Sequence, residues 1–219
     1  VLGLKRGMKI LDLACGQGRL TIEFARRGYV MTGQDINAFF LKQARQSARR
    51  AGVAVRWIKS DMRRIPFAGE FDAVLNLFTS FGYLESDAED QKVLRQVANA
   101  LRAGGRFVME VINRDRLMRV YRERDWRQLA DGTNVLYERR FDVLTGRNLE
   151  RRRKIRPDGT ATEVHLAVRL YALTELVNMC QRAGLRRDAA YGDYDGSAST
   201  MDSQRCILIT EKAAPPTLS

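Results

Sequence analysis

The stretch from Met8 to Arg19 limits what this chain can fold into more than any other. A short apolar run that contains Asp12 leads into two glycines, Gly16 and Gly18, and a helical pattern of apolar residues follows. This order is typical of a buried strand, a tight turn and the start of a helix. Glycine lets the backbone bend and come close to a ligand, and the first helical turn offers it unpaired N–H groups. The stretch therefore predicts a cofactor site beside the first strand of an α/β fold.

Polar residues also stand at the ends of the next three predicted strands. These strands are expected at 29–35, 53–58 and 73–77. Asp35, Asp61 and Asn76 lie at or near their ends, and Asp35 follows Gly18 by 17 residues. That separation suits a carboxylate that binds ribose hydroxyls in a strand–helix–strand unit, although Asp35 or Asn37 could also cap the next helix. Because parallel strands end at one edge of a sheet, these side chains are expected to form one ligand-binding row.

Three parts of the chain share a pattern with one enzyme family. The segment Asp12–Gly18 resembles the first motif of the class I S-adenosylmethionine-dependent methyltransferases, with Ala14 where their consensus usually has glycine. The segments 71–75 and 78–83 resemble the fourth motif of the small members of this family. The segment 101–106 is similar to the turn that joins a helix to their fifth strand.

The resemblance implies S-adenosylmethionine as the methyl donor and S-adenosylhomocysteine as the product. It implies that Asp61 bonds the adenine amino group and that the backbone of Met62 contacts the ring. The residues that it assigns to the cofactor are Asp12, Ala14, Cys15, Gly16, Gly18, Asp35, Ile36, Asp61, Met62, Asn76 and Leu77. Other nucleotides fit less well, because a dinucleotide fingerprint needs a third glycine where Thr21 stands, and a P-loop needs Gly-Lys-Ser/Thr.

The predicted fold is α/β and Rossmann-like: a three-layer sandwich around a mostly parallel seven-stranded sheet with an antiparallel last strand, plus a small antiparallel β insertion. Residues 1–113 and 172–212 are expected to form the core, 114–171 the insertion and 213–219 a disordered tail. Since the first strand follows Val1 so closely, we expect helices to precede this segment. Further elements of the core are expected as helices at 38–50, 89–102 and 171–184 and strands at 106–112, 185–191 and 205–210. Thr174 is the expected cap of the last helix.

The insertion is expected to start with a helix over 114–127. Residues 134–171 then read as three strands that turn at 145–146 and 157–159. Apolar residues alternate from Val164 to Leu170, so the third strand is expected to bury one face. We expect this insertion to cover the substrate side of the site.

Charge and composition bear on whether the protein binds RNA, spans a membrane, holds a metal or contains disulfides. The net charge is +12, and residues 114–156 hold 14 Lys or Arg against 7 Asp or Glu. This excess could bind RNA, but 31 of the 38 basic residues are Arg spread along the chain, which favours a solvated surface. No apolar run approaches the about 20 residues of a membrane span, so a cytoplasmic protein is expected. Three widely spaced cysteines (Cys15, Cys180, Cys206) and one histidine predict no metal site and no disulfide framework.

The acceptor is predicted to be a small molecule that is methylated on nitrogen or oxygen. Tyr83 and Asp193 or Tyr194 are expected to contact it, and His165 is the one side chain whose ordinary pKa suits a base near neutrality. An RNA or ribosome methyltransferase that uses the basic segment 114–156 is the main alternative. A DNA amino-methyltransferase fits less well because its Pro-Pro-aromatic motif is missing after Asn76. A non-catalytic cofactor-binding module and a nicotinamide oxidoreductase also stay open.

Overall fold

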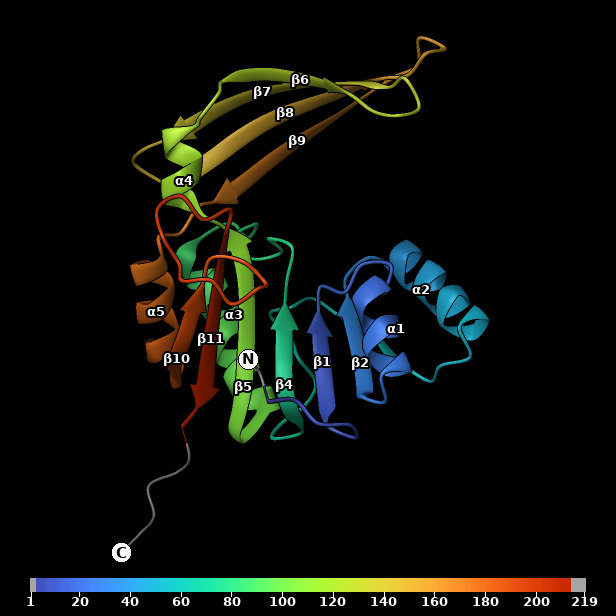
Figure 1. Ribbon diagram of the computed structural model, residues 1–219, viewed down its shortest axis with the longest axis vertical. Coiled ribbons are helices and arrows are strands. Elements are labelled where there is room, and N and C mark those ends of the chain that lie inside the picture. The colour runs from blue at the N-terminus through green and yellow to red at the C-terminus, as the bar shows by residue number, and fades with distance from the viewer. Residues whose placement is uncertain (1–2, 214–219) are drawn as a thin grey trace, which may run out of the picture.

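The computed structural model describes residues 3–213 as two β-sheets with five helices around them (Figure 1). The core elements are β1 (Lys9–Leu13), α1 (Arg19–Arg26), β2 (Val30–Asp35), α2 (Ala38–Arg50), β3 (Arg56–Lys59), β4 (Phe71–Asn76), α3 (Asp87–Ala100), β5 (Leu101–Ile112), α5 (Leu173–Arg182), β10 (Leu185–Tyr191) and β11 (Arg205–Lys212). The insertion between β5 and α5 holds α4 (Arg114–Arg119), β6 (Arg124–Gln128), β7 (Asn134–Asp142), β8 (Arg147–Ile155) and β9 (Ala161–Arg169). Apart from Ala213, the predicted tail lies outside the described residues.

The larger sheet has the strand order β10-β11-β5-β4-β1-β2-β3. Strands β1 to β5 pair in parallel, while β11 pairs antiparallel with both β5 and β10. β10 therefore runs parallel to the first five strands, and the 192–203 loop leaves the sheet on the side where they end. The predicted Rossmann-like fold with an antiparallel last strand is confirmed. No helix among residues 3–213 is long and apolar enough to cross a membrane.

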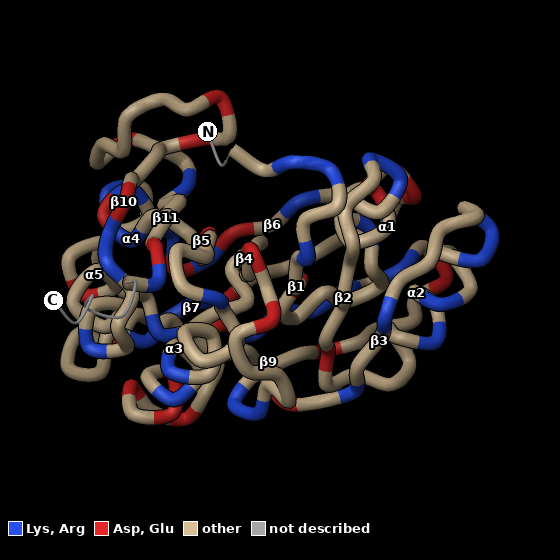
Figure 2. Tube along the Cα trace, turned by 90° about the horizontal axis from the view of Figure 1, so that it is seen from below, with Lys and Arg blue, Asp and Glu red and all other residues tan. Residues whose placement is uncertain are grey.

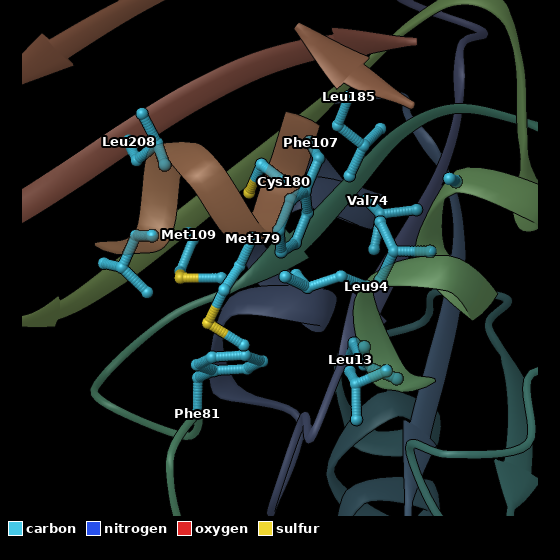
Figure 3. Close-up of a cluster of buried hydrophobic side chains, with 14 of the residues drawn as sticks. Leu13, Val74, Phe81, Leu94, Phe107, Met109, Met179, Cys180, Leu185 and Leu208 are labelled. Atoms are coloured by element: carbon cyan, nitrogen blue, oxygen red, sulfur yellow. The ribbon is translucent and has the colours of Figure 1, made fainter. Parts of the chain in front are cut away.

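Both faces of this sheet carry apolar side chains, and helices pack against each face. Alternate strand residues pack with α3 and α5 in one cluster, in which Phe107, Leu94 and Cys180 are almost fully buried (Figure 3). The opposite face packs against α1 through a smaller cluster that includes Leu75 and Ile207. Each fully buried Leu or Phe side chain contributes roughly 1.5–3 kcal/mol, so this two-sided burial fixes the edge where the parallel strands end.

The second sheet has the order β6-β7-β8-β9 and is antiparallel throughout. It arches over the carboxyl ends of the core strands (Figure 1). The three predicted strands and both turns are confirmed, but the prediction of a helix over 114–127 is wrong beyond Arg119. Residues 124–128 form β6 instead, because the edge of β7 offers backbone partners along its length and pairing overrides local propensity.

Other predictions need smaller corrections. The third strand of the insertion buries no full face, since each of its residues is half-buried or exposed and Val164 is 48% exposed. α3 begins at Asp87, because the Ser86 hydroxyl accepts from the Glu89 N–H and caps it. Thr174 does not cap α5; the Glu175 carboxylate accepts from the Ala172 N–H at 2.7 Å. β5 begins at Leu101, ahead of the prediction, and its pairing with β4 shifts register near the predicted glycine turn.

Candidate cofactor-binding site

The turn after β1 requires glycine for two different reasons. Gly16 and Gly18 have φ angles of 56° and 75°, in the left-handed region that favours glycine. A Cβ on Gly18 would lie 2.4 Å from the Trp57 ring, whereas no described heavy atom lies within 4 Å of a Cβ placed on Gly16. Gly18 is therefore needed for packing, and the backbone at Gly16 is open to a ligand. Ala14 has a φ of 61°, which explains why the family consensus usually has glycine there.

Asp35 ties the end of β2 to this turn. Its Oδ2 accepts the Gly16 N–H at 2.8 Å and its Oδ1 accepts the Asn37 N–H at 2.8 Å. Asn37 caps α2, because its side-chain oxygen accepts from the N–H groups of Phe39 and Phe40. A carboxylate has about four acceptor positions, so Asp35 keeps two for ligand hydroxyls while its orientation is fixed.

Asp12 lies below the turn and is almost fully buried. Burial, together with the charge of Asp35, raises the pKa of its carboxyl to about 6, against a 2.5 Å hydrogen bond that the Thr21 hydroxyl donates. The same burial, with both acids nearby, raises the pKa of the Cys15 thiol, which keeps it protonated at neutral pH. Thr21 therefore supports Asp12 at the place where a dinucleotide fingerprint would have glycine.

A cavity of about 200 Å³ opens between the ends of β1, β2 and β3. Its lining comprises Leu13, Ala14, Gln34, Asp35, Ile36, Ser60, Asp61, Met62, Tyr83 and Leu84. Ile36 is 65% exposed although it is apolar, which leaves a hydrophobic surface at the mouth. Arg63 bonds both oxygens of Asp61, and this hydrogen bonding holds the pKa of that carboxyl below its usual range. Gln34 is fully buried, and its side-chain oxygen has no partner among residues 3–213.

Asn76 closes the row at the end of β4. It is 1% exposed, and its side-chain N–H donates to the Leu13 carbonyl at 3.0 Å. Its Oδ1 has no partner among the described residues, which is costly for a buried acceptor unless a ligand supplies a donor. The structure thus brings together Asp12, Gly16, Asp35, Asp61 and Asn76, which the sequence placed at successive strand ends.

The residues that were predicted to contact the methyl acceptor or to act as a base lie in three different places. Tyr83 lines the cavity beside Asp61, and burial raises the pKa of its hydroxyl. Asp193 and Tyr194 border a second, apolar cavity of about 360 Å³ that also includes Leu77 and Phe78. His165 is not brought to either place.

The His165 ring is 73% exposed and bonds Glu163 at 2.9 Å. It lies in register with Arg151, on the face of the insertion opposite to Arg152 and Glu150. Those two charges act on the Tyr83 hydroxyl, so their face is the one turned towards the core. The candidate base therefore lies on the far face of the insertion, because alternate residues of a strand point to opposite sides.

Four residues of the site had no signal in the sequence. Thr21 and Gln34 lie inside ordinary helix and strand patterns, and their roles depend on partners from other segments. Glu110 and Arg205 form a 2.7 Å ion pair between β5 and β11 that spans 95 positions of the chain. Only the strand pairing brings them together.

Comparisons with known proteins identify similar sequences and similar structures. Residues 10–105 match the family model described as a methyltransferase domain. The Bacillus subtilis (strain 168) protein named "Putative methyltransferase YqeM" is 25% identical over 94% of this chain and 84% of its own length. A ubiquinone/menaquinone biosynthesis C-methyltransferase, UbiE of Idiomarina loihiensis, is 36% identical over 113 residues. That match covers 49% of this chain, which spans less than half of the UbiE relative (43%).

Solved structures share the fold over nearly the whole chain. The CcbJ methyltransferase of Streptomyces caelestis has a TM-score of 0.86 at 20% identity, over 95% of this chain and 84% of that one. CalS10 of Micromonospora echinaspora, an amino pentose methyltransferase solved with S-adenosylmethionine bound, has a TM-score of 0.70 at 20% identity, over 94% and 84% of the two chains. The family-model match and the relatives support an S-adenosylmethionine-dependent methyltransferase, and the solved structures show that the chain shares the fold of such enzymes.

Proposed function

We propose that the strand-end row binds S-adenosylmethionine along its length, from the 200 Å³ cavity to the end of β4. The observation that carries this proposal is the pairing of open backbone at Gly16 with the unpartnered oxygen of Asn76. A methyl donor with an ammonium group at one end and hydroxyls in the middle could lie along the Gly16 backbone and place its ammonium group on the Asn76 oxygen. The residues therefore fit the cofactor of this family.

Each part of the cofactor has a matching group in the row. The adenine ring fits the apolar wall of Ile36 and Met62, and its amino group faces Asp61 and the free oxygen of Gln34. The ribose hydroxyls fit the two acceptor positions that Asp35 keeps. The methionine ammonium fits the Asn76 oxygen. The methyl group would then lie near the end of β4, where the second cavity begins.

The acceptor is proposed to be a small molecule with a nucleophilic nitrogen or oxygen. Support comes from the insertion, which arches over the strand ends (Figure 1), and from the 360 Å³ cavity beside Phe78 and Tyr194. The Tyr194 hydroxyl donates to Glu110, so its oxygen can accept an N–H or O–H from the acceptor. The amino pentose substrate of CalS10 belongs to the same chemical class.

Methyl transfer from a sulfonium is an in-line displacement, and the bound cofactor supplies the activated methyl group. The protein contributes alignment and the exclusion of water. The buried row fixes the donor, while Tyr83 and Tyr194 border the approach to it from the two cavities. A base is required only if the acceptor must lose a proton. Within the row, only the carboxylates could act as that base.

The charge of the insertion gives little support to an RNA acceptor. Lys and Arg are spread over the whole outline of the molecule (Figure 2). Within the insertion, Arg139 and Arg152 both bond Glu150, and Arg151 pairs with Glu138. Internal ion pairs therefore engage three of the 14 basic side chains of residues 114–156.

Isothermal titration with S-adenosylhomocysteine tests the cofactor assignment. Asp35→Ala removes the carboxylate that would accept from the ribose hydroxyls and that anchors the Gly16 N–H. The affinity of this variant for S-adenosylhomocysteine should therefore fall by about 100-fold. Glu163→Ala, on the outer face of the insertion, is the matched control and should bind like the wild type. NAD should bind neither protein. Unchanged affinity in Asp35→Ala would refute the ribose assignment, and binding of NAD alone would refute the proposed function.

A further inference from the structure

One buried carboxylate joins the end of β4 to the loop that follows β10. The side chain of Glu110, on β5, is only 4% exposed. Its Oε2 accepts the Phe78 N–H at 2.9 Å and the Tyr194 hydroxyl, and its Oε1 accepts Arg205 Nη1 at 2.7 Å. Three donors from three separate segments therefore meet on one acidic group.

The first of these segments is strained. Phe78 and Thr79 have φ angles of 58° and 55°, a left-handed conformation that costs a non-glycine residue about 1–2 kcal/mol. Glu110 holds both residues, because its backbone carbonyl also accepts the Thr79 N–H at 3.1 Å. The turn directly follows Asn76 and Leu77, so its conformation sets how the end of β4 is oriented in the strand-end row.

The second and third segments belong to the 192–203 loop and to β11. The Arg205 guanidinium bonds Asp193 at 3.1 Å and lies 4.8 Å from the centre of the Tyr194 ring. Burial and the bond to Glu110 raise the pKa of the Tyr194 hydroxyl, so it stays a donor to Glu110. Asp193 and Tyr194, which border the 360 Å³ cavity from this loop, are thus fixed relative to the Phe78 turn.

We propose that Glu110 is a positioning residue of this methyltransferase: it holds the Phe78–Thr79 turn against the cofactor and, through Tyr194 and Arg205, holds the 192–203 loop beside that turn. The inference rests on the proposed function, since it takes the end of β4 as the methionine end of the cofactor site. Glu110 itself touches neither the donor nor the acceptor.

The test compares S-adenosylhomocysteine affinity, by isothermal titration, with the hydrogen-exchange rate of the Phe78 amide. Glu110→Gln keeps the size of the side chain but has one acceptor oxygen for three donors. We expect about 10-fold weaker binding and at least 10-fold faster exchange at Phe78. Tyr194→Phe and Arg205→Met each remove one link and should weaken binding by about 2- to 5-fold, and Arg205→Lys should recover part of that loss.

Leu94→Ala is the matched control for a merely structural role. It destabilises the core away from the strand ends, and well below its melting temperature it should bind like the wild type. If wild type fails to bind S-adenosylhomocysteine, the proposed function fails. If wild type binds and Glu110→Gln binds within twofold of it, with unchanged exchange at Phe78, the inference is overturned. Should Glu110→Gln not fold, wild-type affinity and exchange in both Tyr194→Phe and Arg205→Met would overturn it instead.

Discussion

The core sheet and the insertion are both made of regular strands, but they bury their side chains very differently. Five of the six residues of β4 are buried, whereas β6 to β9 together bury only Val135, Tyr137 and Asn148. Helices pack against both faces of the core sheet, and the insertion relies on ion pairs such as Arg139–Glu150. A buried sheet can hold polar groups at fixed positions, and the row of polar residues at the strand ends lies in the core. An open sheet tolerates changes in its side chains, which suits a region that is proposed to face the acceptor.

The largest expected effect compares one residue from each region. Leu94→Ala should lower the free energy of unfolding by about 3 kcal/mol, because its fully buried side chain leaves a cavity. Val164→Ala, at a half-exposed position of β9, should cost less than about 1 kcal/mol. Urea denaturation measures both values, and equal losses would contradict the difference in burial.

The two tryptophans make this comparison sharper. Trp57 packs against Gly18 in the core, and Trp126 is 68% exposed on β6. Fluorescence of a Trp126→Phe variant reports the core, and that of a Trp57→Phe variant reports the insertion. We expect Leu94→Ala to lower the urea midpoint seen by both probes and Val164→Ala to change mainly the midpoint seen by Trp126.

A second prediction concerns the buried acid of the core. The pKa of Asp12 is raised from 3.8 to about 6, so its stabilising contribution is present below pH 3.8 and is lost as the pH rises through 6. Asp12→Asn lacks this titration. Between pH 4 and pH 7.5, the stability of the variant relative to wild type should therefore rise by about 2–3 kcal/mol.

Chemical denaturation of both proteins across this range measures that change. Asp90 also has a pKa raised to about 6 by burial, but it is present in both proteins and cancels in the difference. A stability difference that does not depend on pH would show that Asp12 is not buried as the structure places it.

The smallest expected effect lies at the turn after β1. Ala14→Gly removes the strain of a left-handed alanine but gives the unfolded chain more freedom, and the two effects partly cancel. We expect a gain of about 0.5 kcal/mol in the free energy of unfolding. Ala103→Gly, whose φ does not lie in the left-handed region, serves as the control and should lose stability. A loss in both variants would contradict the strain at Ala14.

The sequence predicted the core well because its signals are local there. Each polar residue of the row stands at or near the end of a strand, so its place at the sheet edge needs only the parallel topology. The contacts of Glu110 could not be foreseen, since Phe78, Tyr194 and Arg205 come from segments that meet only after folding. The insertion was harder still: β6 has no buried residue to mark it, and its pairing with β7 decides its structure.

The most direct test of the central claim is a crystal structure with S-adenosylhomocysteine. The account predicts adenine against Ile36 and Met62, ribose hydroxyls on Asp35 and the ammonium group within hydrogen-bonding distance of Asn76 Oδ1. A ligand bound away from Gly16 and Asp35 would contradict it.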